Sequence, residues 1–283
     1  PFSHLKKSNW IYDDKRGDYY FSTFYPEQAD LNWDKPEVFE EMMGVIDFWI
    51  DSGVDGFRLD AVAHLIKREG TDCYHLPEVH EVLKRIRGHI DEKNAEVILL
   101  AEVSGKVEIA KKYFGGDADG RGDECHMVFN FPLMSHFYLA YATGDNSVLE
   151  DVVMESLGIP ANCQWANFIG NHDEINLKTL DSVSREKVAL WLDPENKYSF
   201  PGTSGVSMRL GTVFRSDIEK ILDAFARFLS LPGSPVIYYG SEIGMQNLEL
   251  SDAPSDTRLY VRGDFDWSEA EKQEKDSESL LSG

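Results

Sequence analysis

The strongest constraint on the fold is an alternation of amphipathic helices with short apolar segments that repeats along most of the chain. Residues 36–52 carry apolar side chains at helical spacing, and the short segment 56–62 follows at once. Residues 77–90 repeat the helical pattern and lead into the apolar run 97–101. Helices that alternate with apolar strands are typical of βαβ units, whose strands form a parallel sheet. The sequence therefore predicts an α/β protein.

The same pattern continues to about residue 239. Further strands are predicted at 126–131, 165–169 and 235–239, and a helix with apolar residues at helical spacing covers 218–229. This makes about five strands, whereas a complete (β/α)₈ barrel has eight. The chain is therefore expected to form the C-terminal part of a TIM barrel, about strands 4 to 8.

Both ends of the chain differ from this pattern. Residues 1–33 are rich in aromatic and polar side chains, and we expect a structured excursion with short strands, the end of an insertion between strand 3 and helix 3. Residues 34–249 would then be the second half of the barrel, and 250–283 a polar tail that ends in a solvated helix or a frayed end. The chain starts without an initiator methionine, and we interpret it as a piece of something longer.

Composition narrows the functional classes. Fifty acidic against 28 basic residues give a net charge of −22, which repels nucleic acid and anionic membranes and suits a small neutral substrate. Three widely spaced cysteines make a disulfide framework unlikely, and a cytoplasmic location is expected. No apolar run is long enough for a transmembrane helix.

Two charged residues interrupt the strand predicted at 56–62. A buried parallel strand is normally a near-continuous apolar run, so charges within it cost free energy unless they are paired or used. Arg58 and Asp60 are two residues apart and point to the same face of a strand, so Arg58 can keep Asp60 ionised. A positioned carboxylate suits nucleophilic catalysis on a sugar, and a structural ion pair is the alternative.

Two more carboxylates follow predicted strands. Glu102 comes directly after 97–101, and Asp173 comes shortly after 165–169. The carboxyl ends of barrel strands form one rim, where barrel active sites lie. Asp60 and Glu102 are one βα unit apart and are expected to face each other across a small ligand. Such a pair performs glycoside hydrolysis, with retention when the carboxyl groups are about 5–5.5 Å apart.

The surroundings of these acids fit different roles. Glu102 emerges from an apolar strand, and an apolar environment favours the protonated form that a general acid needs. Asn171 and His172 offer donors and acceptors for sugar hydroxyls. A structural pair of His172 with Asp173 is the alternative.

Four segments resemble the conserved regions of the alpha-amylase family, glycoside hydrolase family 13. They are GFRLDAV at 56–62, LLAEV at 99–103, FIGNHDE at 168–174 and SPVIYYGSEIGM at 234–245. The resemblance implies that Asp60 is the nucleophile and Glu102 the acid/base. It also implies that Asp173 binds two hydroxyls of the sugar in the cleavage subsite, with Arg58 and His172 around the same ring.

Other segments narrow the resemblance within the family. Residues 28–32, QADLN, resemble a sequence that marks the oligo-1,6-glucosidase-like branch. Residues 68–87, 122–134 and 162–174 resemble the subgroup whose enzymes interconvert maltose and trehalose. A hydrolase of short α-1,4- or α-1,6-glucosides is the alternative. A catalytically inactive carbohydrate-binding relative is a second alternative, although all three acids are present. A phosphate-dependent transferase lacks support, because the sequence has no Gly-rich phosphate cradle.

Two further residues are candidates for substrate binding. His64 matches a position that contacts an acceptor sugar in some amylases, and a loop histidine without a special role is the alternative. Arg262 begins the segment RGDFDW, which stands where the subgroup has an RTPMQW-like sequence near the sugar site. The substrate would be maltose, trehalose or a short α-glucan.

The resemblance also sets expectations for cofactors and for the isolated chain. The chemistry needs no cofactor, and a structural calcium ion, which many relatives hold, is left open. The family's first conserved region has no counterpart in these residues, and no C-terminal β-sandwich follows. We therefore expect residues 1–283 alone to be inactive, because an incomplete barrel exposes sheet edges and apolar faces.

Overall fold

The computed structural model describes residues 6–282, which form two compact units. Unit 1 comprises the residues up to Val103 together with Lys111–Val128 and Ile159–Gln164. Unit 2 comprises Ser104–Ala110, Phe129–Gly158 and the residues from Trp165 onward. The predicted division into 1–33, 34–249 and 250–283 stays a prediction.

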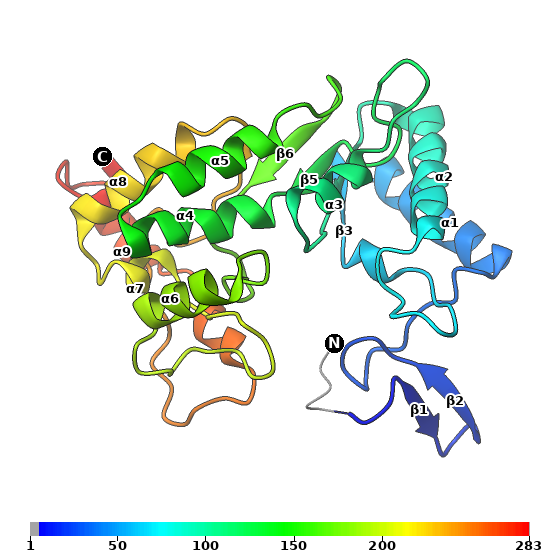
Figure 1. Ribbon diagram of the computed structural model, residues 1–283, viewed down its shortest axis with the longest axis horizontal. Helices are drawn as coiled ribbons and strands as arrows, with labels where there is room; N and C mark the ends of the chain where they lie inside the picture. The colour runs from blue at the N-terminus through cyan, green and yellow to red at the C-terminus, as the bar shows by residue number, and fades with distance from the viewer. Residues whose placement is uncertain (1–5, 283) are drawn as a thin grey trace. The chain divides into compact units, whose positions relative to one another are not determined.

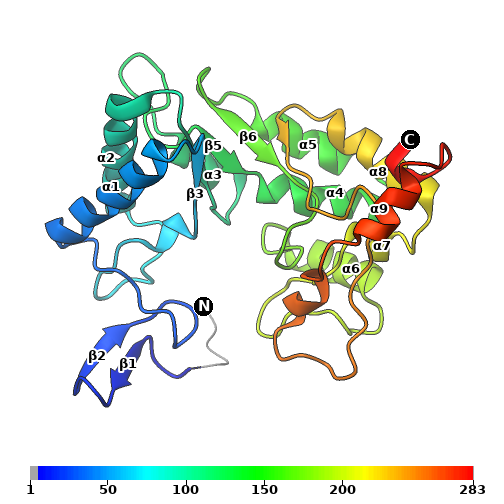
Figure 2. The ribbon, with the colours of Figure 1, turned by 180° about the vertical axis from the view of Figure 1, so that it is seen from behind.

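Unit 1 contains three parallel strands that follow the chain order (Figure 1). Strand β3 (Gly56–Leu59) pairs with β4 (Ile98–Ala101), which pairs in turn with β5 (Met127–Phe129). Helices α1 (Pro36–Asp51) and α2 (Pro77–Asn94) lie side by side in both views (Figures 1 and 2). These strands and helices confirm the predicted βαβ pattern.

The helices of unit 1 begin and pack as their sequences indicate. Each starts with a proline, whose fixed φ suits the first helical position. The apolar face of α2 is buried through Val79, Leu83 and Ile90, which are 0 % exposed. Leu99 on the adjacent strand β4 is equally buried. Short helical turns complete the unit at η1 (Val62–His64) and η2 (Lys112–Phe114).

A two-stranded hairpin precedes α1. Strand β1 (Trp10–Asp13) pairs antiparallel with β2 (Asp18–Phe21), and Gly17 has a φ of 68° in the connecting turn. The pairing of Trp10 with Phe21 places both rings on one face of the hairpin. The short strands expected in residues 1–33 are thus confirmed.

In unit 2, strand β6 (Gln164–Asn167) pairs in parallel with the short strand β7 (Ser234–Pro235). The residues of β6 from Trp165 onward belong to this unit. Its helices are α3 (Val107–Lys111), α4 (Phe131–Thr143), α5 (Ser147–Ser156), α6 (Ser182–Leu192), α7 (Leu210–Val213), α8 (Ile218–Leu229) and α9 (Trp267–Gln273). Helices α4 and α5 lie side by side in both views (Figures 1 and 2). Helix α8 was predicted from the sequence, whereas α4, α5 and α6 were not.

Helix α4 was missed because it is apolar on all sides. Its residues Leu133, Met134, Phe137 and Tyr138 are at most 1 % exposed, so its sequence lacks an amphipathic period. The helix lies in the core of unit 2, where Phe137 and Tyr138 join Phe168 from the segment after β6.

The C-terminal tail is only partly as expected. Helix α9 has no buried residue and is the predicted solvated helix. Of the two alternatives, the solvated helix is the one found. The turn η4 (Leu280–Ser282) then returns to the molecule, and Leu280 joins the core of unit 2. A single leucine in a polar tail gives no periodic signal, and its burial depends on the tertiary contact. Among the described helices, none is long and apolar enough to cross a membrane.

Candidate active site

Arg58 holds both carboxylates that unit 1 contributes. Its Nη1 lies 3.0 Å from Oδ1 of Asp60, and its Nη2 lies 2.5 Å from Oε2 of Glu102. The strand register explains the arrangement: Leu59 pairs with Ala101, and the amide of Glu102 donates a hydrogen bond of 3.0 Å to the carbonyl of Leu59. Asp60 and Glu102 therefore leave adjacent parallel strands at the same level. The predicted contact of Arg58 with Asp60 is present, and Glu102 contacts the same guanidinium. That the two acids face each other across a small ligand stays a prediction.

The two carboxylates differ in exposure. The Asp60 side chain is 73 % exposed, whereas the Glu102 side chain is 20 % exposed. Ala61, which follows Asp60, has a φ of 47° in the left-handed region, so the chain turns sharply as soon as β3 has ended. The turn leaves Asp60 accessible to a ligand at the end of its strand.

His64 lies within an aromatic stack in unit 1. Its ring stacks on Tyr74 at a centroid distance of 4.4 Å and meets the edge of Phe24 at 5.4 Å. Its Nδ1 is 3.3 Å from the carbonyl oxygen of Cys73. Burial lowers the pKa of His64 to about 4, so the ring is neutral at neutral pH. The geometry gives His64 a packing role, and its predicted contact with an acceptor sugar stays a prediction.

Unit 2 positions Asp173 with two arginines. Oδ1 of Asp173 lies 2.6 Å from Nη2 of Arg262 and 3.3 Å from Nη1 of Arg258. Arg258 is itself held by both carboxylate oxygens of Asp256, at 2.8 and 2.7 Å. The guanidinium groups compensate the charge of a carboxylate whose side chain is 24 % exposed.

The loop that carries Asp173 is shaped by its neighbours. The amide of Asp173 donates to Oδ1 of Asn171 at 2.9 Å, and Nε2 of His172 lies 3.4 Å from Oδ2 of Asp173. Arg262 also donates from Nε to the carbonyl of His172 at 2.7 Å. Oδ1 of Asn171 thus accepts a hydrogen bond within the turn, and the guanidinium of Arg262 is bonded to two groups of the same loop. The substrate-binding roles predicted for Asn171, His172 and Arg262 stay predictions.

Sequence reasoning missed Arg258 and Asp256. Both lie in the polar tail, outside any periodic segment, and the only signal was an Asp-Thr-Arg sequence among many charges. Only the folding of the tail against the loop after β6 brings Arg258 to Asp173.

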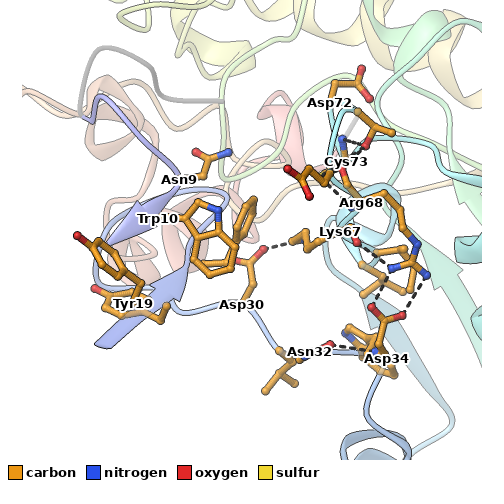
Figure 3. Close-up of a pocket in the computed structure, with 18 of the residues that line it drawn as sticks. Asn9, Trp10, Tyr19, Asp30, Asn32, Asp34, Lys67, Arg68, Asp72 and Cys73 are labelled. Carbon is orange, nitrogen blue, oxygen red and sulfur yellow. Dashed lines mark hydrogen bonds and ion pairs between the residues drawn. The ribbon is translucent and has the colours of Figure 1, made fainter. Parts of the chain in front are cut away.

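A separate cavity of about 910 Å³ lies in unit 1, between the hairpin and the loop 65–73 (Figure 3). Trp10 and Tyr19 line it from the hairpin side, and neither Asp60 nor Glu102 belongs to its lining. Two ion pairs join residues of its lining: Nζ of Lys67 lies 2.7 Å from Asp30, and Nη1 of Arg68 lies 2.8 Å from Asp34.

A metal site within residues 6–282 would need several His, Cys, Asp or Glu side chains close together. Within that range no three His, Cys, Asp or Glu side chains are grouped as a metal site would require. The structural calcium ion that the sequence left open stays untested. The three cysteines, Cys73, Cys125 and Cys163, are free thiols.

Comparison with known proteins gives a consistent family. The model of the alpha-amylase catalytic domain matches residues 2–191. The trehalose synthase/amylase TreS of Mycolicibacterium smegmatis is 41 % identical over 249 residues, which are 87 % of this chain and 41 % of that protein. The trehalose synthase of Thermus thermophilus is 40 % identical over 95 % of this chain and 27 % of its own length. The chain thus spans less than half of the curated relatives it matches.

Solved structures agree on the fold. Sucrose 6F-phosphate phosphorylase from Thermoanaerobacter thermosaccharolyticum superposes with a TM-score of 0.78 at 21 % identity, over 96 % of this chain and 56 % of that one. Isomaltulose synthase from Klebsiella superposes with a TM-score of 0.66 at 20 % identity, over 97 % and 57 %. These likenesses confirm the predicted fold, which is part of a (β/α)₈ barrel.

Proposed function

The chain belongs to the alpha-amylase family, and from that membership we propose that the protein that carries it is a retaining enzyme acting on α-glucosidic bonds. Asp60 is the nucleophile in this proposal, and Glu102 is the general acid and base. The observation that carries it is the strand register, which places Asp60 and Glu102 at the same level at the ends of adjacent parallel strands.

The reaction proceeds in two displacements. A carboxylate oxygen of Asp60 attacks the anomeric carbon while Glu102 protonates the leaving oxygen, which gives a glucosyl ester and a released sugar. Glu102 then takes a proton from the incoming hydroxyl, whose oxygen attacks the anomeric carbon from the face that the first sugar left. The bond from that carbon to Asp60 breaks, and the carboxylate is released. Arg58 supports the first step, because its Nη1 lies 3.0 Å from Oδ1 of Asp60 and holds the nucleophile at the end of its strand.

Asp173 binds hydroxyls of the glucosyl unit in this proposal, and His172 assists it. Two guanidinium groups hold Asp173 in place, and its carboxylate oxygens can accept hydrogen bonds from sugar hydroxyls. Such bonds matter most in the transition state, where hydrogen bonds to the sugar's 2-hydroxyl strengthen.

The finer proposal is that the acceptor is glucose and that the enzyme interconverts maltose and trehalose. Its support is the 40–41 % identity to the two trehalose synthases. Hydrolysis of α-1,4- or α-1,6-glucosides is the alternative, in which water replaces glucose in the second step. An inactive carbohydrate-binding protein is the other alternative.

One experiment separates these functions. The full-length protein is treated with 5-fluoro-α-D-glucosyl fluoride, and its peptides are examined by mass spectrometry; the label is expected on Asp60. Asp60→Asn should remove the label and the activity, whereas Asp51→Asn, on an exposed carboxylate at the end of α1, should change neither. A label on another residue, or no label with an active enzyme, contradicts the assignment of the nucleophile.

The products of maltose then decide the reaction. Trehalose as the main product supports interconversion, and glucose alone supports hydrolysis. Maltose binding with neither product supports the inactive relative.

Two further expectations belong to the same proposal. We propose a reducing, cytoplasmic location, which the three free thiols support. We also propose that the two displacements need no cofactor, because Asp60 and Glu102 supply the nucleophile and the acid and base.

A further inference from the structure

Two consecutive tyrosines hold the backbone on both sides of Arg262. The hydroxyl of Tyr238 donates to the carbonyl of Val261 at 3.0 Å, and the hydroxyl of Tyr239 donates to the carbonyl of Gly263 at 2.6 Å. Arg262, the residue between these two carbonyls, donates to the carbonyl of His172 and to the carboxylate of Asp173. All of these groups lie in unit 2.

We propose that Tyr238 and Tyr239 are positioning residues, which fix the backbone of Arg262 so that its guanidinium holds Asp173 in place. The inference rests on the proposed function only for the role of Asp173 as a substrate-binding acid. The proposal assigns a structural role to the sequence YYG at 238–240, which follows β7.

The tyrosine pair is itself held by a buried arginine. Arg209 is 3 % exposed, and its guanidinium carbon lies 4.7 Å and 4.8 Å from the ring centroids of Tyr238 and Tyr239. Its Nη1 donates to the carbonyl of Tyr239 at 2.7 Å. Its Nε and Nη2 have no hydrogen-bond partner among the described residues, a cost that two aromatic faces offset in part.

Glycine at 240 permits this packing. A Cβ at Gly240 would meet Sδ of Met245 at 2.2 Å and Nη1 of Arg209 at 3.0 Å, and the residue has a φ of 81°. A larger residue would displace the guanidinium from the tyrosine rings.

The segment 261–263 has little freedom on its other side. Tyr260 is 2 % exposed and Val261 is 0 % exposed, and the carbonyl of Tyr260 accepts a hydrogen bond from Leu248 at 2.8 Å. A Cβ at Gly263 would lie 2.7 Å from a methyl carbon of Leu248. Because the backbone is already fixed, only the Arg262 side chain has to be ordered when it is held on Asp173, and the total entropy cost is smaller.

The Tyr238 hydroxyl can donate its hydrogen bond at any working pH. Burial, followed by the hydrogen bond with Tyr239, raises the pKa of Tyr238, so its hydroxyl stays protonated and can donate throughout the working range. The positioning of Arg262 depends on geometry, because each tyrosine hydroxyl reaches one carbonyl beside Arg262.

The test uses the full-length protein and variants that delete single hydroxyls. Tyr238→Phe and Tyr239→Phe should each lower kcat/KM on maltose about three- to tenfold, the usual effect of one lost hydrogen bond. The loss should fall on kcat, with KM little changed, because Asp173 acts in the transition state. Tyr141→Phe is the matched control: it removes a hydroxyl that bonds Asp223 at 2.7 Å, and kcat/KM should not change.

A double-mutant cycle separates positioning from general stability. In an Arg262→Ala background, Tyr239→Phe should cause no further loss, because the group it positions has gone. The proposal is overturned if Tyr239→Phe causes the same fold-loss in that background as in the wild type. It is also overturned if the double variant of Tyr238 and Tyr239 has wild-type kcat/KM.

A second readout needs no activity. Amides of residues 257–264 should exchange hydrogen several-fold faster in both tyrosine variants than in wild type or Tyr141→Phe. Unchanged exchange overturns the proposal. If the wild-type protein turns over no glucoside, the proposed function fails, and this exchange measurement still decides whether the tyrosines hold the segment.

Discussion

At the scale of single residues, Arg58 makes one contact that the sequence predicts and one that it does not. Its place beside Asp60 follows from the period of a strand, which puts residues i and i+2 on one face. Its contact with Glu102 depends on the register of β3 against β4, which pairs Leu59 with Ala101. One guanidinium thus contacts two carboxylates: Asp60 is two positions from Arg58 in the sequence, and Glu102 is 44 positions from it.

His64 gives a prediction about pH. Burial lowers its pKa to about 4, below the ordinary 6.5, so between these values the unfolded chain binds a proton that the folded protein does not. The stability that depends on neutral His64 is present above about pH 6.5 and is lost as the pH falls toward 4. The free energy of unfolding should therefore fall by about 2 kcal/mol more in the wild type than in His64→Phe between pH 7 and pH 5.

Urea denaturation of both proteins at the two pH values measures this difference. Equal losses in the wild type and in His64→Phe would show that His64 is not the group that titrates. Phenylalanine keeps a ring against Tyr74, so the comparison removes the titration and preserves the stacking.

At the scale of elements, the hairpin β1–β2 depends on an ion pair at its base. A two-stranded hairpin is marginally stable by itself. Lys67 donates to the carbonyl of His64 and lies 2.7 Å from Asp30, which also accepts bonds from Thr23. Burial opposes ionisation of Asp30, but the bonds from Lys67 and Thr23 outweigh it and lower the pKa of Asp30.

Replacing Lys67 should loosen this hairpin. Lys67→Met keeps the apolar stem but leaves a half-buried Asp30 without its cation, a loss of about 2 kcal/mol. Hydrogen exchange of residues 10–30 should become faster. Lys93→Met, which breaks a surface ion pair with Asp51, should leave exchange of the hairpin unchanged. Equal exchange in Lys67→Met and wild type would refute the role of the pair.

The C-terminal turn η4 is a second element, and it packs against unit 2 through Leu280. Leu280 is 7 % exposed in the core of unit 2 and touches the position of Gly244. Leu280→Ala should lower the free energy of unfolding by about 2–3 kcal/mol, because the cavity it leaves cannot refill.

The neighbouring leucine is the control. Leu281 is 37 % exposed, and Leu281→Ala should change the free energy of unfolding by less than about 0.5 kcal/mol in the same urea titration. Equal effects of the two substitutions would mean that the tail is not docked through Leu280.

At the scale of the whole molecule, the net charge of −22 has a cost. Excess charge of one sign repels itself most strongly in the compact state. Salt shortens the range of this repulsion, from about 30 Å at 0.01 M to about 3 Å at 1 M.

The protein should therefore be more stable in salt. The urea midpoint should rise between 10 mM and 0.5 M NaCl, although salt also weakens the surface ion pairs. Neutralising exposed tail carboxylates, as in Glu271→Gln with Glu274→Gln, should reduce the rise. A midpoint that falls with salt would show that ion pairs outweigh the repulsion.

Local patterns sufficed for the α/β class and for the candidate acids. Proline at the start of α1 and α2, apolar periodicity and charged residues at strand ends are readable because each signal lies within a few residues. Helix α4 escaped because a helix buried on all sides has no polar face to set a period.

What the sequence alone determined is thus the alternation of strands with helices that defines the α/β class, the family resemblance and the choice of Asp60, Glu102 and Asp173 as candidates. The tertiary structure alone decided that Arg58 reaches Glu102, that Arg258 and Arg262 hold Asp173, and that Leu280 is buried. The physical reason is distance along the chain: Arg262 is 89 positions from Asp173, and no local propensity encodes a contact that forms only when separate elements pack.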